Sequence, residues 1–109
     1  MQQPAAFDAQ PVFRALADPT RRAIIEMLAE KPRSIGEIAA RFDVTRPAIA
    51  KHLRILEEGD VIAVEAKGRE RINSLSPAAL KTAFDWLGYF DRFWDERLAL
   101  LKDLVEDKR

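Results

Sequence analysis

The chain has 109 residues, of which 48% are hydrophobic and 33% are charged, and its formal net charge is zero. This length suits one compact domain, and no apolar run reaches the roughly 18 residues of a membrane span. Because cysteine is absent, disulfides and thiolate metal sites are excluded. The first residues lack the basic and apolar regions of a signal peptide, so we expect a soluble, cytoplasmic protein that does not enter a membrane.

The first third of the chain predicts two short helices after an irregular start. Residues 1–10 have no periodicity and are predicted to be flexible, whereas residues 11–109 are predicted to form a single domain. A helix is expected over about residues 11–17, with a proline in its first turn. Asp18 can cap a second helix that begins at Pro19 and stops at a Lys-Pro pair. The apolar face of this second helix consists of Ile24, Ile25, Leu28 and Ala29.

Residues 34–59 have the pattern of two helices joined by a tight turn. Ser34 and Glu37 form a capping box, in which each side chain can satisfy a free backbone amide at the start of the first helix. Thr45 can cap a longer second helix, which runs to about residue 58 and is stopped by Gly59. Residues 34–59 are therefore predicted to be a helix-turn-helix.

The second of these helices has two chemically different faces. Ile49, Leu53 and Leu56 form the apolar face. A helix in the major groove of DNA needs one face for its own domain and one for bases and phosphates, so this helix is suited to DNA. The alternative is an ordinary solvated helix face. The opposite, polar face carries Arg46, Pro47, Ala50, Lys51 and Arg54.

The residue types on the polar face suggest individual contacts. Arg46, at the start of the helix, could bind guanine through two hydrogen bonds. Lys51 and Arg54 suit phosphates, which position a protein without specifying a sequence. The small side chain of Ala50 permits close approach to the bases, and Thr45 with the free amides beside it could hold a phosphate.

Residues 60–75 predict a β-hairpin with a cationic tip. β-Branched residues favour two strands on either side of a turn at Gly68. The tip carries Lys67, Arg69 and Arg71, and alternation puts the two arginines on one face of the second strand. Such a wing could lie along a DNA backbone or minor groove. The alternative is an edge strand protected by charge.

The zero net charge hides an uneven distribution. Basic residues dominate residues 41–54 and the hairpin tip, whereas acidic residues concentrate after residue 84. A basic surface fits DNA, while a winged-helix module that binds proteins, which is the main alternative, is expected to carry acids here. The residues expected to contact DNA are Ser34, Thr45, Arg46, Pro47, Ala50, Lys51, His52, Arg54, Lys67, Arg69 and Arg71.

His52 is the only histidine and lies beside the apolar face of its helix. A structural role, with a bond to backbone or to a phosphate, is favoured over metal binding, because the chain has no second His and no Cys to complete a zinc site. The chain also has no Gly-rich phosphate loop and no Ser-His-acid arrangement. We therefore expect no catalytic residue, no cofactor and no metal.

Residues 77–106 are predicted to form one long C-terminal helix with two apolar stripes. Leu80, Phe84, Leu87, Trp94 and Leu98 make the first stripe, and a second lies beside it. Together they cover roughly 200° of the helix, wider than one core needs. One stripe is expected to pack on the domain and the other on a second copy of the chain, with a small-molecule pocket between subunits as the alternative. The expected dimer interface consists of Val12, Phe13, Leu16, Trp86, Phe90, Phe93, Leu100 and Leu104.

The predicted fold class is mainly α with a small β-hairpin, a winged helix-turn-helix. Three segments resemble the ArsR-type winged-helix repressors: residues 13–28, residues 44–59 with their His-Leu pair, and the Lys-Gly-Arg-Glu-Arg turn at residues 67–71. The resemblance implies a homodimer that joins through its N- and C-terminal helices. It also implies a sequence-specific repressor whose partner is double-stranded DNA with an imperfect palindrome, the two halves being about 34 Å apart.

The sequence departs from the sensing chemistry of that family. Many members sense metals or oxidants through a Cys-containing motif in the first helix of the helix-turn-helix, but residues 35–42 contain no Cys. Others place His and carboxylates along the last helix, where this chain has acids without His. Metal sensing is therefore not expected, and release from DNA by a protein partner, by a small organic ligand or by dilution alone stays open.

Overall fold

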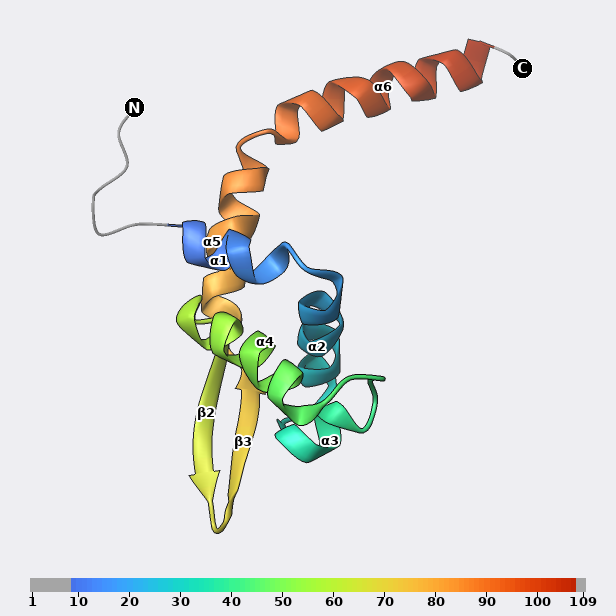
Figure 1. Cartoon of the computed structure of the whole chain (residues 1–109). Helices are drawn as coiled ribbons and strands as arrows, with labels where there is room; N and C mark the ends of the chain where they lie inside the picture. The colour runs from blue at the N-terminus through green and yellow to red at the C-terminus, as the bar shows by residue number, and fades with distance from the viewer. Residues whose placement is uncertain (1–8, 108–109) are drawn as a thin grey trace.

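The computed structural model describes residues 9–107 and contains, within them, six helices and a three-stranded sheet (Figure 1). Residues 1–8 of the predicted flexible start lie outside the described residues, and Gln10, its last residue, already belongs to a helix. The fold class predicted from the sequence is confirmed. In chain order the elements are α1 (Gln10–Leu16), α2 (Pro19–Glu30), β1 (Arg33–Ser34), α3 (Ile35–Ala39), α4 (Arg46–Glu58), β2 (Ile62–Lys67), β3 (Glu70–Leu75), α5 (Pro77–Gly88) and α6 (Asp91–Asp107).

The sheet is antiparallel with the order β1-β3-β2. Lys67 pairs with Glu70 across a two-residue turn, and Gly68 has φ 61°, a left-handed conformation that glycine adopts without steric cost. The third strand, β1, was not predicted. Two residues are too few to show the alternation that marks a strand, and the strand is revealed by its pairing with β3, Arg33 to Asn73 and Ser34 to Ile72.

The core lies where α1, α2, α3 and α4 meet the base of the sheet, and α4 supplies three of its buried residues. The first helix packs very closely on the end of α4. A Cβ atom at Gly59 would lie 2.7 Å from the carbonyl oxygen of Pro11, so this position requires glycine for space. The fully buried apolar side chains that fill the centre of the core are Ile24, Ile38, Ile49, Leu56 and Val61.

The C-terminal region is two helices, so the prediction of one helix over residues 77–106 is wrong. The break falls at Tyr89 and Phe90, whose amides make short-range bonds to Trp86 and Leu87 carbonyls. The physical reason is a helix-end signal followed by a helix-start signal. Gly88 weakens the end of α5, and Asp91 places a carboxylate in the first turn of α6. Figure 1 shows that the chain changes direction here.

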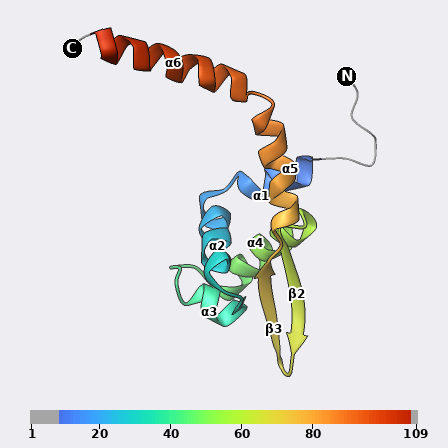
Figure 2. The same ribbon diagram turned by 180° about the vertical axis from the view of Figure 1, so that it is seen from behind.

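Helix α6 projects away from the rest of the domain, as both views show (Figures 1 and 2). Every residue from 91 to 106 is exposed. The radius of gyration is 18.5 Å, against about 13 Å for a compact chain of this length. The prediction that one apolar stripe packs on the domain is therefore wrong beyond its first residue, Leu80, since Phe84 and Leu87 are 70% and 56% exposed. Within residues 9–107, no helix has the length and apolar run that a membrane crossing needs.

Candidate nucleic-acid interface

The capping box predicted at residues 34–37 is present and fixes the start of α3. The Ser34 hydroxyl accepts a hydrogen bond from the Glu37 amide at 3.2 Å, and the Glu37 carboxylate accepts one from the Ser34 amide at 3.0 Å. This second bond lowers the pKa of Glu37 below its ordinary value. Ser34 is buried at 8% exposure, so the structure places this predicted DNA contact inside the domain, with its hydroxyl already occupied.

Helix α4 begins at an exposed turn. The Thr45 hydroxyl accepts a hydrogen bond from the Ala48 amide at 3.3 Å, and Pro47 stands in the first turn, where its missing amide costs nothing. Thr45, Arg46 and Pro47 are all exposed. This end of the helix therefore offers its free backbone amides and the Arg46 side chain to a partner.

The guanidinium of Arg46 lies over the start of α3. A Cβ atom at Gly36 would be 2.7 Å from Arg46 Nη2, so the guanidinium occupies the space that a side chain at Gly36 would fill. The sequence reasoning missed the role of Gly36, because a glycine in a short helix gives no sign of which side chain passes over it.

The cationic side chains of α4 and of the hairpin have no acidic partner. Among the described residues, no hydrogen bond or ion pair joins any of their side chains to another group. Some cations elsewhere in the domain do pair, as in the Arg33–Glu30 and Lys81–Asp85 bridges, both 2.9 Å long. Together with Arg41, from the turn between α3 and α4, the exposed, unpaired cations of α4 and of the hairpin are here called the basic face, which comprises Arg41, Arg46, Lys51, Arg54, Lys67, Arg69 and Arg71.

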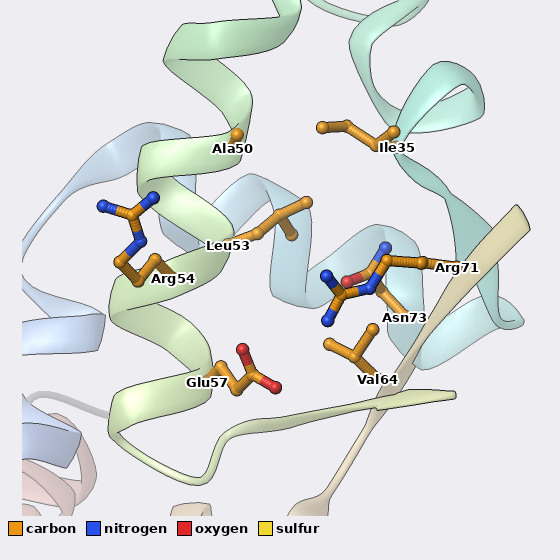
Figure 3. Close-up of a pocket in the computed structure, with 8 residues that line it drawn as sticks. All are labelled: Ile35, Ala50, Leu53, Arg54, Glu57, Val64, Arg71 and Asn73. Carbon is orange, nitrogen blue, oxygen red and sulfur yellow. The ribbon is translucent and has the colours of Figure 1, made fainter. Parts of the chain in front are cut away.

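The two arginines of the hairpin lie in different places. Arg69 precedes β3 and belongs to the turn, so the shared strand face expected for the two does not arise. Arg71 is paired with Ala66, on the same side of the sheet as Val64 and Asn73. Figure 3 shows that this side faces α4. Arg71 therefore lies between the wing and α4, and only Lys67 and Arg69 are at the tip.

His52 points away from the basic face, toward the junction of α1 and α2. Its Nδ1 lies 3.3 Å from Arg21 Nη1 and 3.9 Å from Asp18 Oδ2. Arg21 is nearly buried and donates to the carbonyl oxygens of Ala15 and Arg14, at 3.0 and 2.7 Å. The ring of His52 thus belongs to a polar cluster that joins α1, α2 and α4, a structural place rather than the phosphate contact included among the predictions.

Asp18 completes this cluster and caps α2. Its carboxylate accepts a hydrogen bond from the Arg21 amide at 3.1 Å, and this bond lowers the pKa of Asp18, with His52 and the Arg21 charge as smaller causes. The structural role of Arg21 was not predicted from the sequence. The signal for it was a charged residue three positions before Ile24, in line with the apolar face.

The residues predicted for the dimer interface separate into two groups. Val12 is buried in the core of its own domain and Leu16 packs partly against that core, so neither offers much surface to a partner. The aromatic residues instead form a continuous row, with ring centroids 5.5 Å apart for Phe13–Trp86 and 5.1 Å for Trp86–Phe90. Phe93 continues the row, and Leu100 and Leu104, which are 60% and 58% exposed, follow it along α6.

Within residues 9–107, no cluster of three or more His, Cys, Asp or Glu side chains is placed to hold a metal ion. The chemistry available on the basic face is therefore the binding of anions by Lys, Arg and backbone amides.

Comparison with known families and proteins gives a consistent result. A family described as a helix-turn-helix domain matches residues 16–65. The HTH-type transcriptional regulator Rv2034 of Mycobacterium tuberculosis is 37% identical over 99 residues, which cover 88% of this chain and 87% of that protein. The transcriptional repressor SdpR of Bacillus subtilis is 37% identical over 76 residues, covering 70% and 84% of the two chains.

Solved structures agree with the sequence matches. The ArsR-like transcriptional regulator from Rhodococcus sp. RHA1 superimposes with a TM-score of 0.72 at 35% identity, and the match covers 90% of each chain.

Proposed function

Because this chain belongs to the ArsR-type family of winged helix-turn-helix transcriptional repressors, and is a DNA-binding regulator rather than an enzyme, we propose that it acts in the cytoplasm as a homodimer on a palindromic operator. The observation that carries the proposal is the basic face. Seven exposed cations without acidic partners surround α4 and the wing, and such a surface gains most from a partner with closely spaced negative charges.

In this proposal α4 enters the major groove. Arg46 contacts a base edge, since it stands at the exposed first position of the helix, where recognition helices meet bases. Lys51 and Arg54, one turn and two turns further, contact phosphates. The free amides beside Thr45 bind a further phosphate. Ser34 and His52 support α3 and α4 from inside the domain and contact no DNA.

The wing contributes sequence-independent affinity. Lys67 and Arg69 at the tip lie along the backbone or in the minor groove, where each cation displaces condensed counterions. Arg71 adds charge at the angle between the wing and α4. A winged-helix module for protein partners is the weaker candidate, because its face would carry acids where this one carries cations.

The proposed homodimer forms through the aromatic row and α6. Residues 91–106 are all exposed and include seven large apolar side chains. A monomer that left them in water would forgo about 1.5–3 kcal/mol for each one that could be fully buried. A second copy of the chain covers them in the proposal, and the twofold axis places two α4 helices about one DNA turn apart.

A DNA-binding titration tests the proposal. The full-length protein is titrated by fluorescence anisotropy onto the DNA upstream of its own coding sequence and onto random DNA of equal length, at several salt concentrations. We expect tighter binding to the upstream DNA and a linear loss of log affinity with log salt. Lys81→Ala, which removes a paired cation far from the basic face, is the matched control. Equal binding to both DNAs at every salt concentration contradicts the proposal.

A further inference from the structure

A pocket of about 220 Å³ lies between α4, the start of α3 and the inner side of the hairpin (Figure 3). Its walls are apolar where α4 meets the sheet, with Leu53 and Ala50 on the helix and Val64 on β2. Ile35 of α3 closes the end of the pocket near the helix-turn-helix. The proposed contacts to DNA explain the cations around this pocket, but they do not explain its apolar walls.

Two side chains of opposite charge, Arg71 and Glu57, face this pocket without forming an ion pair. Figure 3 shows the guanidinium of Arg71 reaching from the strand toward α4, and the carboxylate of Glu57 reaching from α4 toward the hairpin. Within residues 9–107, neither group has an ion pair or a hydrogen bond. Arg54 also lines the pocket, but its guanidinium points away from Arg71, so Arg71 is the cation that faces Glu57 across the pocket.

We propose that this pocket binds a small aromatic carboxylic acid. The carboxylate pairs with Arg71, the ring lies against Leu53 and Val64, and a hydrogen-bond donor at the far end of the ring reaches Glu57. A guanidinium favours a planar carboxylate, because it can donate two parallel hydrogen bonds. A dry cavity of about 150 Å³ accepts benzene in another protein, so the larger volume here suits one ring with two substituents.

The charges of Arg71 and Glu57 also determine which molecules bind poorly to the pocket. A neutral aromatic molecule covers part of the exposed Arg71 side chain without pairing its charge, and a charge that loses water without gaining a partner is destabilised. A second carboxylate in place of the donor faces the Glu57 carboxylate, and like charges repel. The pocket therefore selects a monoanion with a donor opposite the acid.

The molecule that occupies this pocket would regulate DNA binding. This regulatory step rests on the proposed function. Arg71 belongs to the basic face, and a carboxylate paired with it cancels a charge that would otherwise meet DNA. The acid and DNA then lower each other's affinity by the same factor, which we expect to be about 5- to 150-fold. An aromatic acid would thus release the protein from its operator without a cysteine or a metal.

The test measures binding of 4-hydroxybenzoate to the free full-length protein by methyl NMR. We expect shifts of the Ile35, Leu53 and Val64 methyl groups, and dissociation constants at least about tenfold higher for 4-hydroxybenzamide, which lacks the anion, and for terephthalate, which lacks the donor. The result that overturns the proposal is the absence of shifts at all three residues with 4-hydroxybenzoate, or equal affinity for the acid and the amide. The same shifts produced by inorganic phosphate would also overturn it, by showing a site for a phosphate alone.

Three variants separate the parts of the site, each checked by its NMR spectrum for an intact fold. Arg71→Gln should abolish binding of 4-hydroxybenzoate, and Glu57→Gln should remove the discrimination against terephthalate. Val64→Phe fills the pocket without changing charge, so it should abolish acid binding and leave DNA affinity unchanged. If both Arg71→Gln and Val64→Phe bind the acid as well as the natural sequence does, the assignment of this pocket is wrong.

Release from DNA is measured separately, by adding 4-hydroxybenzoate to the protein–DNA complex. Acid binding in the NMR titration is independent of DNA, so a protein that binds the acid but no specific DNA contradicts the proposed function alone. A protein that binds both, with unchanged DNA affinity at saturating acid, contradicts the regulatory step.

Discussion

Helices α4 and α6 are both exposed to solvent, but what they expose differs. Three residues of α4 are buried, so its own domain holds the helix in place, and its outer face carries unpaired cations. No residue of α6 from 91 to 106 is buried, and its exposed residues include Trp94 and Leu98, at 65% and 61% exposure. One helix is anchored and offers charge, while the other is unanchored and offers apolar surface.

The two helices therefore need partners of opposite chemistry. Contacts of α4 with a polyanion should weaken with salt, because they depend on counterion release. Contacts of α6 with an apolar partner should be nearly insensitive to salt and should give the negative heat-capacity change that accompanies apolar burial.

The largest effect is expected from removal of the apolar surface of α6. The double substitution Trp94→Glu/Leu98→Glu should convert the proposed dimer to a monomer and lower operator affinity by about 10²- to 10⁴-fold, because the two DNA-binding domains would no longer be linked. Light scattering after gel filtration gives the mass, and fluorescence anisotropy gives the affinity. Asp103→Ala, on the polar side of α6, should change neither. A double variant that stays dimeric would contradict the proposal that α6 forms the dimer interface.

A substitution at the packed end of α4 should lower the free energy of unfolding instead. Gly59→Ala places a methyl group against the Pro11 carbonyl, where a Cβ atom would be 2.7 Å away, and we expect a loss of about 1–3 kcal/mol in the free energy of unfolding. Chemical denaturation measures this loss. Gly88→Ala is the matched control, because its new Cβ atom meets only Asp91 Oδ2 at 3.7 Å, and it should not destabilise. Equal destabilisation by both would contradict the packing argument.

The specificity of α4 should depend on Arg46. Arg46→Ala should cost about 1–3 kcal/mol of discrimination at one base position, because the contact proposed for Arg46 is to a base edge. Binding to a set of operator variants, each with one base pair changed, measures this discrimination. Loss of affinity that is uniform over all operator variants would assign Arg46 to a phosphate instead.

A substitution in the wing should instead weaken binding to DNA of any sequence. Lys67→Ala should weaken binding to all sequences alike and reduce the slope of log affinity against log salt by about 1. Anisotropy titrations at four salt concentrations give this slope. Glu65→Ala, also on β2, is the control and should not reduce it. A selective loss at one base position after Lys67→Ala would overturn the division between specificity at α4 and general affinity at the wing.

The smallest effect is expected from lowering the pH. The pKa values of Asp18 and Glu37 lie below their ordinary values of 3.8 and 4.5, because each carboxylate accepts backbone hydrogen bonds at a helix start. A carboxylate with a lowered pKa stabilises the folded state fully above its unfolded pKa, and this stabilisation is lost as the pH falls through the folded pKa. Thermal stability should therefore fall below about pH 4.5, and Glu37→Gln should flatten that fall. Glu106→Gln, on α6, should leave it unchanged.

The anchored region could be predicted well because its signals are local. The caps at Asp18, Ser34 and Thr45 lie within a few residues of the amides that they satisfy, so the sequence alone locates the starts of α2, α3 and α4. The strand β1 could not be predicted, because two residues carry no periodicity and their pairing partner lies about 40 residues away.

The site was predicted less completely because side-chain direction depends on tertiary packing. The helix pattern placed His52 beside the apolar face but did not give the direction of its ring, which points to the buried Arg21 at the α1–α2 junction. Strand alternation located Arg71 on a face without saying which face meets α4. The α5–α6 break did have a local signal, in Gly88 followed by Asp91, but a continuous apolar pattern through Tyr89 and Phe90 obscured it.

The break at Tyr89 and Phe90 has a consequence for how such a regulator could evolve. In the proposed dimer, the bend between α5 and α6 sets the distance between the two α4 helices, while side chains such as Arg46 set which bases are preferred. Half-site spacing and half-site sequence would then be inherited through different residues. Substitutions at the bend would move the protein to operators of a new length with the same half-sites, and substitutions on α4 would change the half-sites at constant length.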